Sequence, residues 1–212
     1  MSNSVITISR QYGSGGHEIG LKLAQALHVP CHDKDIVENI ANEKGYCAEI
    51  IDRFDEKPAQ SLLYSLVMNS YGNWYSNDNY KPLQMAVQQA QIDIIQSLAK
   101  EPCVIIGRAA DRILEDVGCV SIFVHADMAT RIAQIMQRRS CSEKEAQKAI
   151  AAIDRDRAQH YHYYSDKKWG DATNYSLSLD SGILGVDGSV ELILSCLEIV
   201  KATPHGNKNA TP

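Results

Sequence analysis

The chain has 212 residues, of which 44% are hydrophobic and 22% are charged, and its formal net charge at pH 7 is −5. This length allows one domain with a sizeable core, and the composition excludes a collagen-like, disordered or membrane-spanning chain. The negative charge disfavours a general binder of nucleic-acid polymers. The N-terminal residues carry no signal-peptide pattern, so we expect a cytoplasmic protein with no membrane partner.

Short apolar runs and amphipathic stretches alternate along the chain. The apolar runs predict buried strands, in chain order at residues 5–8, 28–31, 103–106, 119–124 and 175–179. Apolar residues at helical spacing predict helices at residues 19–27, 33–43, 83–99, 109–116, 127–139, 142–161 and 189–201. Ser142 and Glu145 fit a capping box at the start of the longest of these helices.

This alternation predicts an α/β protein, a three-layer α/β/α sandwich with a parallel sheet of about five strands. Sheets of this kind bind ligands beyond the carboxyl ends of their strands. The loops that follow the first four strands are therefore expected at one edge, and they carry Arg10, the glycines after it, Asp33, Arg108 and Asp127.

Two segments depart from the alternation. Residues 53–80 interleave tyrosines and tryptophans with asparagines, which we interpret as an insert that forms a flap over a substrate or an ordered aromatic surface loop. The same segment offers a contact for a homodimer. Residues 202–212 are polar and are predicted to form a disordered tail, which leaves residues 1–201 as a single domain.

Cysteines and histidines predict no metal site. The six cysteines contain no Cys-x-x-Cys pair, and we expect small buried thiols in a reducing compartment. His160 and His162 lie close in sequence, but no acid or cysteine completes a ligand set with them at the usual spacing.

The glycine-rich stretch after the first strand predicts a phosphate site. It reads S-R-Q-Y-G-S-G-G-H-E-I-G from Ser9 to Gly20. Glycines between a strand and a helix let backbone N–H groups turn toward a phosphate, and the helix N-terminus adds a favourable dipole. We expect the phosphates of a nucleotide cofactor to contact Gly13, Ser14, Gly15, Gly16, His17 and Glu18.

The loop completes neither of the two phosphate-binding signatures that it approaches. A Walker loop, G-x-x-x-x-G-K-[ST], would need glycine at Arg10, lysine at Gly16 and serine or threonine at His17. A dinucleotide fingerprint, G-x-G-x-x-G, would need glycine at Glu18, although Asp33 does follow at about the spacing of a ribose-binding acid.

Four pieces in a fixed order carry a resemblance that spans the chain from Ile6 to about Val200. They are I-T-I-S-R-Q-Y-G-S-G-G-H-E-I-G, V-I-I-G-R-A-A-D, I-D-R-D-R-A-Q-H-Y and W-G-D-A-T-N-Y-S-L-S-L-D-S. Together they resemble the cytidylate kinase-like family, a branch of the P-loop nucleoside monophosphate kinases. The resemblance implies that fold with a helical lid, at about residues 138–170, and places residues 53–80 on the acceptor side.

The resemblance also implies roles for several residues. Arg108, Asp33 and Asp171 would hold the phosphoryl acceptor, ATP with Mg²⁺ would be the donor, and Arg155 and Arg157 in the lid would stabilise the transferring group. Each residue has a structural alternative. Arg108 would pair with a carboxylate, the two acids would cap helices or turns, and the lid arginines would form local pairs such as Asp154 with Arg157.

The missing Walker lysine needs a substitute if the loop is to hold a donor. We hypothesise that Arg10 supplies this charge, because it leaves the same strand just before the glycines. His17 is the second candidate, at a helix start that disfavours its charged form.

Two functions remain open. One is a kinase that transfers a phosphoryl group from ATP to a nucleoside monophosphate such as CMP, or to a similar small acceptor. The other is a non-catalytic nucleotide-binding sensor or regulatory protein with a degraded Walker loop. A nicotinamide-type binder is disfavoured by Glu18 and by the basic lid. In either case the expected partners are small nucleotides.

Overall fold

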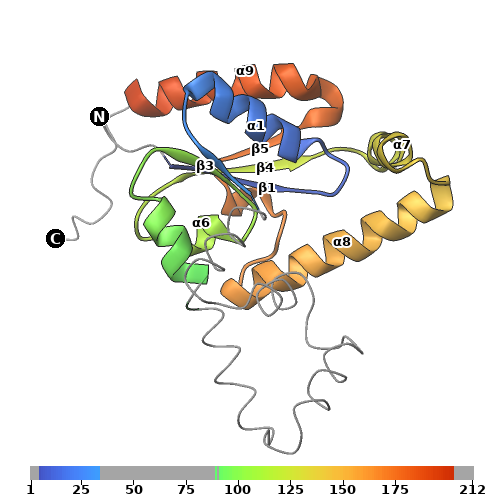
Figure 1. Ribbon diagram of the computed structural model, residues 1–212, viewed down its shortest axis with the longest axis horizontal. Coiled ribbons are helices and arrows are strands. Elements are labelled where there is room, and N and C mark those ends of the chain that lie inside the picture. Colours follow the sequence, from blue (N-terminus) through green and yellow to red (C-terminus); the bar gives the residue numbers. More distant parts are fainter. Residues whose placement is uncertain (1–4, 34–88, 90, 203–212) are drawn as a thin grey trace, which may run out of the picture.

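The computed structural model describes residues 5–33, 89 and 91–202 (Figure 1). Besides a helical stretch over residues 91–98, its elements are β1 (Val5–Arg10), α1 (Gly16–Leu27), β2 (Cys31–His32), β3 (Cys103–Ile106), α6 (Ala110–Ile113), β4 (Val120–His125), α7 (Met128–Arg139), α8 (Glu143–Tyr164), the 3-10 turn η1 (Ala172–Asn174), β5 (Leu177–Asp180) and α9 (Ser181–Ala202).

All five strands are parallel, in the order β2-β3-β1-β4-β5. Ile8 near the end of β1 pairs with Ile106 on β3 and with Ile122 on β4. The carboxyl ends of these strands therefore lie at one edge, and the glycine loop after β1 is next to the Gly107–Arg108 turn after β3.

Helices cover both faces of the sheet (Figure 1). One face carries Ile6, Ile8, Val104 and Ile122, which pack against α1 and α9 in a single buried cluster. Alternate strand residues point to the opposite face, where the cluster includes residues of the 91–98 helix and of α6. This period of two is what a sheet buried on both faces requires, and it confirms the predicted three-layer sandwich.

Several element boundaries differ from the predicted ones. β2 begins at Cys31 because His28 caps α1 in the left-handed conformation, with φ 54°, and turns the chain before pairing starts. α9 begins eight residues before the predicted start, and its first turn ends at Gly185, whose φ of 66° is not helical. The predicted helix over residues 33–43, the insert over 53–80 and the start of the helix over 83–99 lie outside the described residues.

Helices α7 and α8 form a pair beside the glycine loop. The predicted capping box is present at the start of α8, where the Ser142 hydroxyl accepts from the Glu145 N–H and the Glu145 carboxylate accepts from the Ser142 N–H. The two helices enclose a cluster of Ile132, Ile135 and Ile150 that also buries Tyr12 of the loop. Among the described residues, no helix is long and apolar enough to cross a membrane.

A buried polar contact fixes the other end of α8. The Tyr161 hydroxyl donates to Oδ2 of Asp111 on α6 at 2.9 Å, and both side chains are buried. Burial raises the pKa of the Asp111 carboxyl above its ordinary value of 3.8, and the hydrogen bond from Tyr161 opposes this shift. The charged form of Asp111 is therefore less favourable in the folded protein than in the unfolded chain.

This raised pKa predicts a pH-dependent effect of Asp111→Asn, which keeps an oxygen for Tyr161 and removes the titration. Ionisation of Asp111 costs the folded state stability as the pH rises above about 4. The Tm of the variant relative to wild type is therefore expected to be more favourable at pH 7 than at pH 4, as measured by thermal denaturation. Asp116→Asn, at an exposed acid, is the control, and equal Tm differences at both pH values would contradict the prediction.

Candidate functional site

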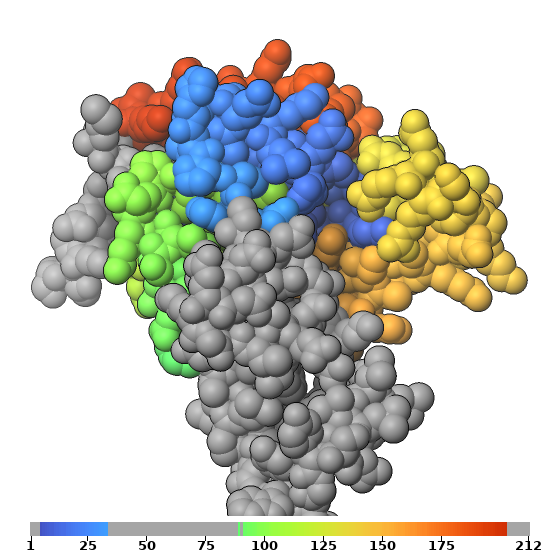
Figure 2. Space-filling model, in the orientation of Figure 1, coloured from blue at the N-terminus to red at the C-terminus, as the bar shows by residue number. Residues whose placement is uncertain are grey.

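Two adjoining cavities lie at the carboxyl edge of the sheet. The larger, which we call the loop cleft, has a volume of about 830 Å³ and is lined by residues 10–13 and 15–18 together with Leu21, Gln134, Ile135, Gln137, Arg138 and Arg157. In Figure 2 it opens between the blue surface of α1 and the yellow surface of α7.

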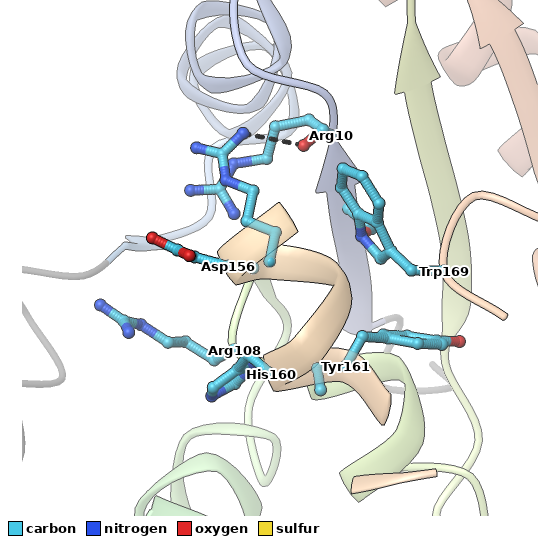
Figure 3. Close-up of a pocket in the computed structure, with 10 residues that line it drawn as sticks. Arg10, Arg108, Asp156, His160, Tyr161 and Trp169 are labelled. Carbon is cyan, nitrogen blue, oxygen red and sulfur yellow. Dashed lines mark hydrogen bonds between the residues drawn. The ribbon is translucent and has the colours of Figure 1, made fainter. Parts of the chain in front are cut away.

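The second, which we call the small cavity, has a volume of about 30 Å³ and lies between the ends of β1 and β3 and α8 (Figure 3). It is lined by Ser9, Arg10, Gly107, Arg108, Ala109, Asp156, Arg157, His160, Tyr161 and Trp169. Arg10 and Arg157 are the two residues that line both cavities.

The glycine loop has a backbone that exposes N–H groups. Gly13 and Gly15 have φ values of 83° and 73°, the left-handed region that favours glycine. The hydroxyl of Ser181 donates to the carbonyl of Ser14 at 2.6 Å. Because a trans peptide holds its C=O and N–H on opposite sides, this bond turns the Gly15 N–H away from Ser181. α1 begins at the next residue, and its first N–H groups have no acceptor within the helix.

Tyr12, the residue before these glycines, is held by hydrogen bonds at both its N–H and its carbonyl. The carboxylate of Asp154 on α8 accepts from the Tyr12 N–H at 2.7 Å and from Nη1 of Arg131 on α7. The same Nη1 also donates to the Tyr12 carbonyl at 3.4 Å. Asp154 therefore pairs with Arg131 rather than with Arg157, the partner that helical spacing suggested. This buried ion pair fixes the glycine loop on α7 and α8.

The side chain of Arg10 lies across two glycines. A Cβ built on Gly16 would be 2.5 Å from the Arg10 Cβ, and one built on Gly107 would be 2.2 Å from the Arg10 Nη1. Both distances are too short for any side chain larger than hydrogen. Gly16 stands at the Walker lysine position, so the room that a lysine there would need is occupied by Arg10.

Arg157 lies beside Arg10 on the neighbouring helix. Its Nη1 donates to the Arg10 carbonyl at 2.9 Å, the bond drawn as a dashed line in Figure 3. Two cationic side chains from β1 and α8 thus meet between the loop cleft and the small cavity. Arg108 completes the cationic lining of the small cavity, with a buried side chain and a left-handed φ of 63°.

The family model for the cytidylate kinase-like family matches residues 5–183. The chain belongs to this family. No curated protein matches the chain.

Solved structures share the fold of this cytidylate kinase-like protein. An uncharacterised protein from Eubacterium ventriosum is 24% identical, with a TM-score of 0.69 and coverage of 92% of this chain and 98% of that one. TT1252 from Thermus thermophilus is 16% identical, with a TM-score of 0.56 over 96% and 100% of the two chains. Shikimate kinase from Bacteroides thetaiotaomicron is 14% identical, with a TM-score of 0.51 over 92% and 98%.

Three of the residues that the family resemblance selected, Arg155, Asp171 and Asp33, line neither cavity. The side chain of Arg155 is 68% exposed and lies 3.8 Å from Asp156. Asp171 caps η1 and accepts hydrogen bonds from the N–H and hydroxyl of Thr173, which hold the pKa of its carboxyl below 3.8. The capping alternative for Asp171 therefore describes its observed contacts.

His17 and Asp33 meet at the rim of the loop cleft. His17 Nε2 lies 3.0 Å from Asp33 Oδ2, so the side chain at the position of the Walker hydroxyl is directed at a carboxylate. Glu18 lines the cleft and lies 3.8 Å from Lys22. Within the described ranges, no group of three or more histidine, cysteine, aspartate or glutamate side chains is arranged to hold a metal ion.

Sequence reasoning missed several cavity residues. Trp169 donates from Nε1 to the Ser9 hydroxyl at 3.0 Å, and both line the small cavity with His160 (Figure 3). Trp169 stands in one of the motifs that carried the family resemblance, which was the available signal. Asp156 adds a carboxylate to the same cavity, and its position directly before Arg157 was a second signal.

The close approach of Arg10 predicts opposite effects for the same substitution at two helical glycines. Neither Gly16 nor Gly188 has a positive φ, and alanine in a helix is favoured over glycine by about 1 kcal/mol. Gly188→Ala, whose Cβ would meet only the Leu184 Cβ at 3.8 Å, is expected to raise the Tm. Gly16→Ala is expected to displace Arg10 and to lower the Tm, because its Cβ would lie 2.5 Å from the Arg10 Cβ, and thermal denaturation measures both variants. A Tm of Gly16→Ala at or above that of wild type would contradict this close contact.

Proposed function

We propose that this protein is a phosphotransferase that moves the γ-phosphoryl group of ATP to a small acceptor, with a nucleoside monophosphate such as CMP as the leading class. The observation that carries the proposal is that Arg10 and Arg157 line both cavities. A donor in the loop cleft and the anionic group of an acceptor at the small cavity would place the transferring group between these guanidinium groups.

The loop cleft suits the donor. Its glycine backbone presents N–H groups at a helix N-terminus, which is a favourable environment for phosphate oxygens. Arg10 brings to this backbone the charge that lysine brings to a Walker loop. An arginine keeps its charge at any physiological pH and offers a planar fork of donors, so it can hold two phosphate oxygens at once.

The small cavity, at about 30 Å³, suits only the anionic group of an acceptor, and the rest of the acceptor would lie outside it. The buried guanidinium of Arg108 supplies a fork that matches phosphate geometry. Asp156 and His160 line the same cavity and would contact polar groups of the acceptor. Asp33, beside His17, is the further acceptor residue that we propose at this edge.

Mg²⁺ would be held mainly by the phosphates of ATP, because this ion keeps several waters and takes only one or two protein carboxylates. Glu18, which lines the loop cleft, and Asp33, beside His17, would be the candidate carboxylates for such an ion. The ion would neutralise charge on the phosphates. The protein residues act on the remaining charge, since phosphoryl transfer needs positioning and electrostatic stabilisation rather than covalent catalysis.

A specific feature favours the second candidate, a nucleotide-binding sensor without turnover. His17 replaces the Walker hydroxyl and is directed at Asp33 instead of at a phosphate-bound ion. The two functions are separated by incubating the protein with Mg²⁺-ATP and a panel of nucleoside monophosphates. We expect ADP to form with one class of acceptor. ATP binding without ADP formation would support the sensor, and absence of ATP binding would contradict both functions.

If Arg10 replaces the Walker lysine, its loss is expected to be repaired by restoring that lysine. Arg10→Gly is expected to lower kcat/KM roughly 100-fold or more, as the loss of a donor to a developing charge does. Gly16→Lys alone is expected to be impaired because the new side chain collides with Arg10. The Arg10→Gly/Gly16→Lys double variant, which also removes the Arg10 Cβ that would lie 2.5 Å from a Cβ at position 16, is expected to recover part of the activity in a coupled ADP assay.

The control for this series is Lys144→Ala, which removes an exposed cation from the first turn of α8 and is expected to leave kcat/KM unchanged. A double variant with activity no higher than either single variant would contradict the exchange of roles between positions 10 and 16.

A further inference from the structure

The ring of Tyr12 lies among three guanidinium groups. The central carbon of Arg138 is 5.1 Å from the ring centroid, that of Arg139 is 5.5 Å away and that of Arg157 is 5.7 Å away. All three distances are within the range in which the face of an aromatic ring attracts a cation. The ring itself is only 9% exposed and packs against Ile132 and Ile135, so it is a fixed surface on which these cations gather.

The three charges repel one another, and nearby carboxylates do not balance those on α7. Neither Arg138 nor Arg139 forms an ion pair with a carboxylate among the described residues. Both lie in the last turn of α7, where the helix dipole favours positive charge. The aromatic ring and the helix end therefore hold the cations together, and an anion that entered between them would relieve their repulsion.

The cluster lies next to the glycine loop because the ring at its centre belongs to Tyr12. Tyr12 is the residue directly before Gly13, and Asp154 and Arg131 hold its backbone on both sides. Arg138 and Arg157 line the loop cleft, whereas Arg139 does not. The loop N–H groups and the guanidinium groups of Arg138 and Arg157 therefore border the same cleft. The Tyr12 side chain sets the distance between the loop and these two groups.

We propose that Tyr12 is a positioning residue that directs Arg138 and Arg157 into the loop cleft, and that Arg138 contacts the phosphates of the bound nucleotide. The inference rests on the proposed function, since it takes the loop cleft as the ATP site. It changes which cationic residues are expected to form that site. Arg155, which the sequence favoured, is exposed away from both cavities, and Arg138 on α7 takes the place of the second cation.

The first experiment compares two neighbouring arginines by titration calorimetry with Mg²⁺-ATP. Arg138→Gln is expected to weaken ATP binding roughly tenfold or more, as the loss of a charge-assisted contact does. Arg139→Gln removes the same charge from the same ring without removing a residue that lines the cleft, and it is expected to change affinity less than about threefold. Equal losses in the two variants would overturn the assignment of Arg138.

The second experiment tests the ring without changing any charge. Tyr12→Phe keeps the aromatic face and is expected to bind ATP like wild type. Tyr12→Leu fills the pocket with an aliphatic side chain, and it is expected to lower both the ATP affinity and the dependence of that affinity on salt concentration. A change in salt dependence reports lost charge contacts, which a loosened but uncharged pocket would not produce. Unaltered salt dependence in folded Tyr12→Leu would overturn the positioning role.

The outcomes separate this inference from the function on which it rests. If wild type does not bind ATP, the proposed function fails. If wild type binds ATP and the two arginine variants bind alike, the function stands and the inference fails. Should Tyr12→Leu not fold, which its thermal denaturation would reveal, the comparison of Arg138→Gln with Arg139→Gln still decides the matter, because both positions are exposed on the surface of α7.

Discussion

The close packing of Arg10 against Gly16 and Gly107 is the constraint on which the rest of the site depends. Parallel pairing of β1 with β3 brings Gly107 beside Arg10, and the Gly107 N–H donates to the Ile8 carbonyl at 2.9 Å. Because the start of α1 leaves room only for hydrogen at Gly16, the arginine side chain passes over it. In the function that we propose, the cation that a Walker loop places on the helix would be supplied by the strand before it.

Helix α8 is a wall of the site as well as part of the predicted lid. Along it, Asp154 bonds to the glycine loop, Arg157 to the carbonyl of Arg10, and Tyr161 to Asp111 on α6. These three residues follow at spacings of three and four and share one face of the helix. A motion that swung the whole of α8 outward would break all three bonds and would separate Asp154 from Arg131 on α7.

The fold followed from the sequence because its signals are local. Apolar runs and helical spacing identified the strands and most helices, and parallel topology then placed Arg10 and Arg108 at one edge. The sequence did not predict which of Arg155 and Arg157 lines the cavities. Residues two apart on a helix face opposite ways, so the sequence predicts that one arginine points outward but not which. Tertiary packing decides this, as it decides the contact of Asp154 with Tyr12 across 142 positions.

The departure of the loop from the Walker signature is interpreted differently from the structure than from the sequence. Read along the chain, glycine at the lysine position indicates a lost phosphate contact and favours a sensor. Read in space, Gly16 leaves room for the Cβ and Cγ of Arg10, and the Arg10 Nη1 lies where a Cβ on Gly107, in the turn after β3, would stand. Glycine at position 16 is therefore consistent with the proposed relocation of the charge to Arg10, and by itself it does not favour the sensor.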